Sequence, residues 1–562
     1  MNIRFNDGAA SDPEQDARDV LARQAALRAA HDFPTFEPAM TVGYRSAGRT
    51  LIVGSAADAL PLADQLAAAL PVTVLLLDEP DGPAPITLRI YPVHAARNVA
   101  LAGWLGAFEA RWQAPGQPVG GGKFDLVLDL CPQRLIDSHQ SPHGYHAPGP
   151  GAVARSAAVT ALLDLVGDFE KPKYFNYNER ICAHSRNGID ACNACIDICS
   201  AKAIVGDGDK IKVNPYLCAG CGACGTVCPT GAMRYAYPPA PLTGKRIQAA
   251  LRAFREAGGA QPVLLLIDAA GAELLAQLGD AVPGRVLPFE LHHVAATGID
   301  VWLAALAYGA SGVAILAAGD VAPQYIGALG EQMTIAQTVL DGLGYDGPHF
   351  QLVQTGGAGP EAAQELALAL RHAPRGASCT TPATFHLALE KRNTLDYALD
   401  HLHRHAPQQP QHIDLPPRAP FGTLAVNPAT CSLCMSCVGV CPANALQDGQ
   451  GEPQLRFIEK NCVQCGLCAN TCPENAITLV PRMSFAPERM KAVVLNASQP
   501  FHCIRCSKPF GTLHMVQNML GRLGGHPAFA ANPDRLRMCG DCRVIDMMAP
   551  VDEMRVTPVS RN

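Results

Sequence analysis

Cysteines are the residues of this chain most able to do chemistry, and two groups of them repeat the spacing C-x2-C-x2-C-x3-C-P. The first group is Cys431, Cys434, Cys437 and Cys441, and the second is Cys462, Cys465, Cys468 and Cys472. In this spacing three thiolates on one tight loop bind three irons of a 4Fe-4S cubane, and the fourth thiolate binds the neighbouring cluster. The sequence therefore predicts one cluster on Cys431, Cys434, Cys437 and Cys472, and a second on Cys462, Cys465, Cys468 and Cys441.

Two earlier groups follow the same rule less regularly. One keeps the full spacing, with Cys218, Cys221, Cys224 and Cys228 before Pro229. The other has nine residues between Cys182 and Cys192, continues with Cys195 and Cys199, and has Ser200 in place of the proline. The same exchange predicts one cluster on Cys182, Cys192, Cys195 and Cys228, and one on Cys218, Cys221, Cys224 and Cys199. If Cys182 does not bind, its centre is a three-iron cluster or has another ligand.

Zinc and disulfide bonds are the alternatives for these sixteen cysteines. Zinc sites usually pair two C-x2-C knuckles at long separation, whereas three cysteines here follow one another at three-residue steps. Disulfides need an oxidising compartment. Because the segment Met1–Asp7 has neither an apolar core nor a twin arginine, we expect a cytoplasmic protein with iron-sulfur clusters.

A further group of four cysteines near the carboxyl terminus has another spacing. Cys503-x2-Cys506 is followed after a helical stretch by Cys539-x2-Cys542. Two knuckles of this kind predict a structural zinc ion with four thiolate ligands. A fifth iron-sulfur centre or a redox-active dithiol remains open at this stage. The isolated Cys131 and Cys379 are expected to be ordinary thiols.

Composition limits what surrounds the clusters. The chain has 562 residues, 48% of them apolar, and a net charge of −6 with no basic run. Several domains with real cores are expected, and nucleic acid is not an expected partner. The uncharged segment 301–319 is long enough to span a membrane. Its internal Gly309-Ala310-Ser311-Gly312 instead predicts a helix followed by a buried strand, so no transmembrane segment is expected.

The elements around the first two groups follow an α/β pattern. Strands are predicted at residues 50–54, 72–77 and 124–130, with a helix at 56–70. The turn after residue 54 lacks the second and third glycines of a dinucleotide-binding fingerprint. Gly120-Gly121-Gly122-Lys123 is no phosphate-binding loop either, because Phe124 stands where the magnesium-binding hydroxyl should be. We expect this domain to hold no cofactor.

A second α/β pattern lies between the two cysteine-rich regions. Strands are predicted at residues 263–267, 285–289, 313–316 and 350–353, with helices between them. The fold class is therefore α/β plus α+β multidomain, with a small zinc-ribbon-like domain at the carboxyl end. The predicted divisions are an N-terminal helix (1–35), an α/β domain (36–170), a dicluster module (171–240), a second α/β domain (241–375), a helical connector (376–420), a second dicluster module (421–482) and a four-cysteine domain (483–562).

Two resemblances go beyond the motifs. Residues 299–319 and the predicted helix at 334–343 resemble the small iron-sulfur delta subunit of hydrogenases, but Ala317-Ala318-Gly319 replaces that family's cysteines. No 2Fe-2S centre is therefore expected there, and the domain is interpreted as a docking or spacing element. The whole order of domains resembles bacterial ferredoxin-type 4Fe-4S proteins associated with molybdenum-dependent formate dehydrogenases, and residues 535–547 are part of that likeness.

The leading hypothesis is single-electron relay through four 4Fe-4S clusters between a dehydrogenase, with formate dehydrogenase implied by the resemblance, and an acceptor. An electron carrier or oxidoreductase subunit is expected rather than a stand-alone enzyme, because cluster iron carries the electron and no acid-base residue is needed. Two alternatives stay open. The chain could be a maturation factor with structural clusters, or a flavin- or NAD-linked oxidoreductase subunit.

Overall fold

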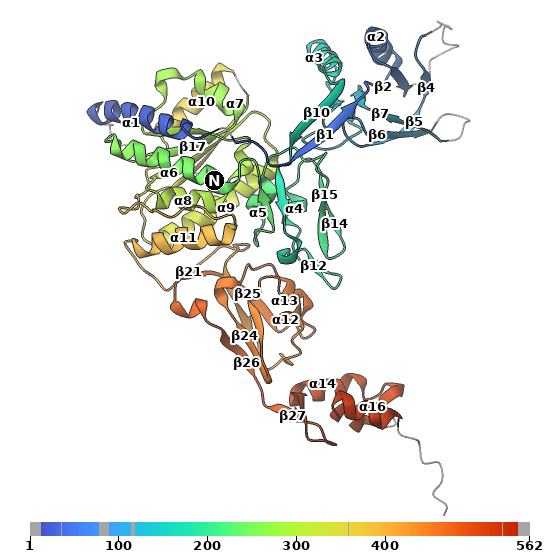
Figure 1. Ribbon diagram of the computed structural model, residues 1–562, viewed down its shortest axis with the longest axis vertical. Helices are drawn as coiled ribbons and strands as arrows, with labels where there is room; N and C mark the ends of the chain where they lie inside the picture. Colours follow the sequence, from blue (N-terminus) through green and yellow to red (C-terminus); the bar gives the residue numbers. More distant parts are fainter. Residues whose placement is uncertain are drawn as a thin grey trace, which may run out of the picture. The chain divides into compact units, whose positions relative to one another are not determined.

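The computed structural model describes residues 13–34, 36–77, 89–113, 119–357, 359–530 and 532–548 (Figure 1). The chain divides into two compact units. Unit 1 holds residues 1–180 and 193–409, and unit 2 holds residues 181–192 and 410–562. Unit 2 therefore takes a twelve-residue segment from the middle of the first cysteine-rich region, and each unit is described by itself.

The first α/β domain of unit 1 is built on a five-stranded parallel sheet. Its strand order is β4 (Val93–Ala95), β3 (Val72–Leu76), β2 (Thr50–Gly54), β8 (Leu126–Asp129) and β9 (Tyr145–His146). Strand β2 is buried along its whole length, as its unbroken apolar run predicts. Helices α2 (Ala56–Leu66) and α3 (Ala152–Leu163) pack their buried faces on the sheet.

Two predicted elements of this domain end differently in the structure. Helix α2 stops at Leu66, four residues early, ahead of Pro71, which disfavours helical backbone at the residue before it. The strand predicted at 124–130 is two strands, because the buried Asp125 accepts hydrogen bonds from Arg49 and the Ala47 amide and turns the chain. The glycines 120–122 lie in β7 (Gly120–Phe124), which completes an antiparallel sheet with β5 (Arg97–Ala102) and β6 (Phe108–Gln113).

The second α/β domain has a four-stranded parallel sheet. Its order is β18 (Val286–Glu290), β17 (Val263–Ile267), β19 (Gly312–Ala318) and β20 (Phe350–Thr355), which confirms all four predicted strands within three residues at each end. The surrounding helices are α6 (Ala240–Glu256), α7 (Ala269–Ala276), α8 (Ile299–Ala307), α9 (Pro323–Gly342), α10 (Pro360–Arg371) and α11 (Lys391–Arg404). Helix α9 is twice as long as the predicted helix, starting from Pro323 at its first position.

The N-terminal helix α1 (Pro13–His31) belongs with this second α/β domain rather than with the nearby first one. It packs on α6, and Arg23 donates hydrogen bonds to the carbonyls of Val282 and Pro283. Asp19 is buried and accepts a hydrogen bond from the Ala260 amide. The helix therefore closes a domain that begins more than two hundred residues later in the chain.

The uncharged segment 301–319 lies inside the second α/β domain. Helix α8 and strand β19 are both fully buried, and β19 is hydrogen-bonded to strands on either side. Within the described ranges, no helix combines the length and apolarity needed to cross a bilayer.

The two dicluster regions share one topology. In the first, β11 (Phe175–Tyr177) pairs with β16 (Met233–Tyr235) around an inner hairpin of β14 (Ile204–Asp207) and β15 (Lys210–Val213). In the second, β22 (Gly422–Val426) pairs with β25 (Ile477–Ser484) around β23 (Leu446–Gly449) and β24 (Glu452–Phe457). Each half carries a short helix, and these are α4 (Ala194–Asp197), α5 (Ala223–Val227), α12 (Ser436–Val440) and α13 (Leu467–Thr471).

Smaller elements complete the chain. Strands β1 (Thr41–Ser46) and β10 (Gly167–Pro172) form a separate pair in unit 1. In unit 2, β12 (Ser185–Arg186) pairs with β13 (Ile189–Asp190), β21 (His412–Asp414) joins β25, and β26 (Val493–Ala497) joins β24. The carboxyl end has β27 (Pro500–His502), β28 (Pro509–Thr512), α14 (Leu513–Leu523), α15 (Pro527–Ala530) and α16 (Gly540–Met548).

Candidate iron-sulfur and metal centres

The three regular cysteine groups share a backbone conformation. In each, the residue before the second cysteine and the residue after it have positive φ angles between 53° and 84°, and these pairs are Gly220 and Gly222, Leu433 and Met435, and Gln464 and Gly466. Left-handed backbone is costly for leucine, methionine and glutamine, so the loop must impose it. Alternating left- and right-handed residues form concavities whose amides attract anions, as an iron-sulfur cluster with thiolates requires.

The irregular group departs from this conformation. Asn193 follows Cys192 and has a φ angle of −112°, where the three regular groups have a left-handed residue at the start of the short helix. The helix itself is kept, because Cys195 lies in α4 as Cys224, Cys437 and Cys468 lie in α5, α12 and α13. The irregularity is thus confined to the amino-terminal side of the loop.

All four groups share the turn after the last cysteine. The third residue beyond it is left-handed in every case, at Lys202, Gly231, Asn444 and Asn475. A backbone amide then donates to the cysteine sulfur, from Ala203 to Cys199 at 3.2 Å, Ala445 to Cys441 at 3.3 Å, Ala476 to Cys472 at 3.3 Å and Met233 to Cys228 at 3.4 Å. Ser200, which replaces proline in the irregular group, does not disturb this turn.

Three cavities are each lined by one predicted set of four cysteines. One cavity is lined by Cys199, Cys218, Cys221 and Cys224. A second is lined by Cys441, Cys462, Cys465 and Cys468, and a third by Cys431, Cys434, Cys437 and Cys472. In each case the fourth cysteine of one group faces the three of its neighbour, as the exchange rule requires. The donor set of four cysteines therefore fits a 4Fe-4S cluster in all three.

The fourth predicted set is divided between the two units. Cys182 and Cys192 lie in unit 2, and Cys195 and Cys228 lie in unit 1. Cys182, Cys195 and Cys228 are buried, and Cys192 is half-buried. This ligand set remains a prediction.

The segment that carries Cys182 and Cys192 packs within unit 2. Ala183, Ala191 and Cys192 share an apolar cluster with Val440, Leu467 and Cys465 of the second dicluster region. The Asn470 side chain donates a hydrogen bond of 3.0 Å to the Asp190 carbonyl, and His184 contacts the Cys192 carbonyl through Nδ1 at 3.1 Å. Ala183, Asp190, Ala191 and Cys192 therefore contact the second dicluster region, whereas His184 contacts Cys192 of its own segment.

Burial controls the protonation of the cysteines before iron arrives. It raises the pKa of Cys218 to about 11 and the pKa values of Cys437 and Cys465 to about 12. Without iron, these three cysteines are therefore thiols at neutral pH. Cluster assembly must release those protons, since only the thiolate binds iron.

Side chains from elsewhere in unit 1 reach the first dicluster region. Tyr325 of α9 donates a hydrogen bond of 3.0 Å to the sulfur of Cys221. The ammonium of Lys391, at the start of α11, donates to the carbonyls of Thr226, Gly225 and Cys228, and Lys171 donates to the Cys218 carbonyl at 2.7 Å. Sequence reasoning missed all three, because a single tyrosine or lysine far along the chain carries no spacing signal.

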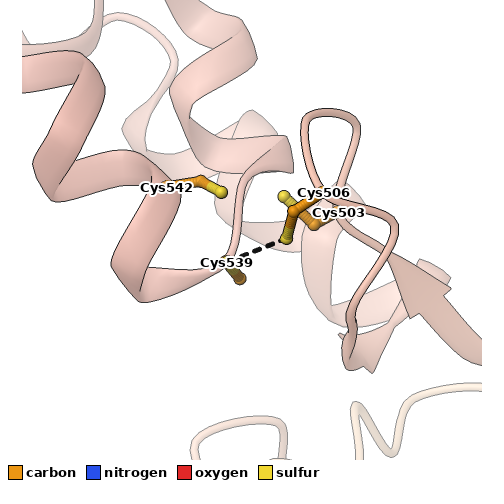
Figure 2. Close-up of side chains that lie close together, drawn as sticks. All are labelled: Cys503, Cys506, Cys539 and Cys542. Carbon is orange, nitrogen blue, oxygen red and sulfur yellow. Dashed lines mark hydrogen bonds between the residues drawn. The ribbon is translucent and has the colours of Figure 1, made fainter.

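The four carboxyl-terminal cysteines form a separate centre (Figure 2). Their sulfur atoms all lie within 4.8 Å of one another, and those of Cys506 and Cys539 are 3.6 Å apart. Cys503 and Cys506 follow strand β27, whereas Cys539 and Cys542 lie at the start of helix α16. One knuckle is therefore on a hairpin and the other at a helix terminus. Cys503, Cys539 and Cys542 are buried and Cys506 is exposed.

The spacing of these sulfurs favours one metal ion. Zn–S bonds of about 2.3 Å place tetrahedral thiolates about 3.8 Å apart. In a cubane each thiolate binds a different corner iron, so the sulfurs must lie further apart. Burial raises the pKa of Cys503, but amides of Cys539, Cys506 and Arg505 outweigh it and lower that pKa to about 6. These amides stabilise the Cys503 thiolate, which is the form that binds a metal cation.

Comparison with known families agrees with the two dicluster regions. Residues 430–477 match a family described as 4Fe-4S dicluster domain, and residues 190–232 match a second family of the same description. Two dicluster domains account for four clusters. The first match covers all eight cysteines of its region, whereas the second begins after Cys182. No curated protein is significantly similar to the chain.

Proposed function

We propose that this chain is an electron-transfer protein that relays single electrons through four 4Fe-4S clusters between redox partners. The observation that carries the proposal is the set of three cavities, each lined by four cysteines drawn from two neighbouring loops. Backbone amides donate to cysteine sulfur at all four loop exits, and such bonds stabilise the reduced, more negative cluster.

An exposed cysteine favours exchange of electrons at the protein surface. Cys434 is exposed, whereas every other cysteine assigned to a cluster is buried or half-buried. The cluster on Cys431, Cys434, Cys437 and Cys472 is therefore the one through which a partner would give or take electrons. The resemblance of the domain order points to a dehydrogenase, formate dehydrogenase in particular, as one partner.

The carboxyl-terminal cysteines are proposed to hold a structural zinc ion. The mutual closeness of the four sulfurs supports a single tetrahedral metal. Its role is to fix a small domain in which few large apolar side chains are buried, since Cys503, Met538, Cys539 and Cys542 make up its core.

Anaerobic purification followed by metal counting and reductive titration tests both proposals. We expect about sixteen irons and about one zinc per chain, with cluster absorbance that bleaches on reduction. Clusters that stay oxidised across the physiological range would instead favour a maturation factor whose clusters are structural. A flavin or nicotinamide released from the purified protein would favour an oxidoreductase subunit, because a switch point between β2 and β8 is where such sheets bind dinucleotides.

A further inference from the structure

Tyr325 connects the second α/β domain to one cluster. It lies in the first turn of α9, its side chain is 1% exposed, and it packs with Ile198, Ala223 and Ala295 beside the cysteine loops. Its hydroxyl donates to the sulfur of Cys221 at 3.0 Å. That sulfur lines the cavity of Cys199, Cys218, Cys221 and Cys224, so the donor points at a predicted cluster ligand.

The Tyr325 hydroxyl also contacts Ser200, the residue that replaces the usual proline. Ser200 is buried, its hydroxyl lies within hydrogen-bond distance of the Tyr325 hydroxyl, and it donates to Gln140 Oε1 at 3.1 Å. Proline at this position, as at Pro229, Pro442 and Pro473, could not make these contacts. The departure from the motif thus coincides with an added polar contact.

Iron bound to Cys221 would determine which group donates in each hydrogen bond of the series Ser200, Tyr325 and Cys221. A cluster-bound thiolate has no proton and only accepts, so Tyr325 must donate to Cys221. Tyr325 then has no second proton, and Ser200 donates to it. Ser200 has a single proton, so it then no longer donates to Gln140 Oε1, and the Gln140 amide keeps its contact with Ser200 only by presenting Nε2 instead.

We propose that Tyr325, held by Ser200 and Gln140, raises the reduction potential of the cluster on Cys218, Cys221, Cys224 and Cys199. Adding an electron makes the cluster more negative, and an O–H donor at a ligand sulfur stabilises the more negative state. Because the hydroxyl is enclosed, water does not screen this interaction. The second α/β domain, interpreted from sequence as a spacer, would then set a redox property of its neighbour.

This inference rests on the proposed electron-transfer function and deepens it. Tyr325 acts through Cys221 and is a positioning and tuning residue rather than a cluster ligand. In the second dicluster region, Gln464 Nε2 donates to Cys462 at 3.4 Å and Ser436 contacts Cys434 at 3.4 Å, and both residues lie in the cysteine loops of that region.

The test is a redox titration followed by electron paramagnetic resonance on the holoprotein and on Tyr325→Phe, which removes only the hydroxyl. We expect the iron content to stay unchanged and one of the four midpoint potentials to fall. Tyr308→Phe is the matched control, because Tyr308 is equally buried and its hydroxyl donates to the Phe385 carbonyl, away from sulfur. Four unchanged potentials in Tyr325→Phe would overturn the proposal.

Ser200→Ala provides a second variant if Tyr325→Phe loses iron. It keeps the bond from Tyr325 to Cys221 but frees the tyrosine to rotate, so the same potential should fall by less. An unchanged potential in this variant, with iron retained, would count against the hydrogen-bond series. If the unmodified clusters refuse electrons, the proposed function fails. If they accept electrons and the variants behave like the parent, only the role of Tyr325 fails.

Discussion

In the first dicluster region, side chains from distant parts of unit 1 reach the cysteine loops, whereas in the second region two residues of the cysteine loops themselves, Gln464 and Ser436, contact sulfur. Tyr325, Lys391 and Lys171 come from α9, α11 and β10. The second region has an exposed cysteine, Cys434, and its sulfur donors Gln464 and Ser436 are local. The turn after the last cysteine is nevertheless the same in both, and three of the four cysteine loops share one conformation. The cysteine loops therefore provide the ligands in both regions. The side chains around the loops differ, and they enclose the cluster beside Tyr325 but leave Cys434 exposed.

The largest expected effect is a loss of iron. It tests whether the fourth cysteine of each group binds the cluster of the neighbouring group, as predicted for both regions. Cys437→Ala/Cys472→Ala removes two ligands of one predicted cluster and should cost about four irons. Cys441→Ala/Cys472→Ala removes one ligand from each of two clusters and should leave two three-iron centres, a loss of about two irons. Iron analysis and the resonance of oxidised three-iron centres distinguish them. Cys379→Ala, an isolated buried thiol, should keep all the iron. Equal losses in the two double variants would contradict the exchange.

A smaller loss of iron tests whether Cys182, in the irregular group, is a ligand in the same way as Cys431 in a regular group. Cys182 and Cys431 are each the first cysteine of a region. Replacing either with alanine should convert one cluster to a three-iron centre and cost about one iron. The same resonance in both variants would assign Cys182 as a ligand. If Cys182→Ala keeps its full iron while Cys431→Ala does not, the first region uses another ligand.

A buried lysine beside the first dicluster region should contribute more to the free energy of unfolding than a partly exposed ion pair in the second. The Lys391 ammonium caps carbonyls beside Cys228 and interacts with the buried Asp300, whose pKa burial raises. Lys391→Met should therefore lower stability by about 3 kcal/mol. Arg482→Met in the second region breaks a partly exposed pair with Glu459 and should cost about 1 kcal/mol. Denaturant-induced loss of cluster absorbance measures both. A smaller effect for Lys391→Met than for Arg482→Met would reverse the comparison.

The smallest expected effect concerns the local sulfur donor of the second region. Gln464 Nε2 donates to Cys462 at 3.4 Å and shares its protons with the Thr423 carbonyl at 3.0 Å. Gln464→Leu should lower one midpoint potential by less than Tyr325→Phe does, because the bond it removes is longer. Gln454→Leu, whose amide contacts Glu452 instead, is the control. A larger drop than in Tyr325→Phe would show that local donors dominate in both regions.

The sequence predicted the parts of the site that depend on neighbouring residues. Cysteine spacing identified the sets that line three cavities, because those thiols are brought together by single loops and one hairpin. It also predicted all four strands of the second parallel sheet and strands β2 and β3 of the first. It did not predict that 124–130 would split at Asp125, since the turn depends on Arg49, far away in sequence. It could not find Tyr325 or Lys391 either, because their roles arise only when separate domains pack together.

The packing of residues 181–192 also has a consequence for how the chain folds. This segment is synthesised among the residues of unit 1, yet its contacts are in unit 2, and Asp190 and Asn470 are 280 positions apart. Non-local contacts of this kind form late and slowly. On the ribosome, this segment cannot make its contacts with the second region until residue 470 has emerged. Oxygen or stray metal would meet the thiols of Cys182 and Cys192 during that interval, before the second region could pack against their segment.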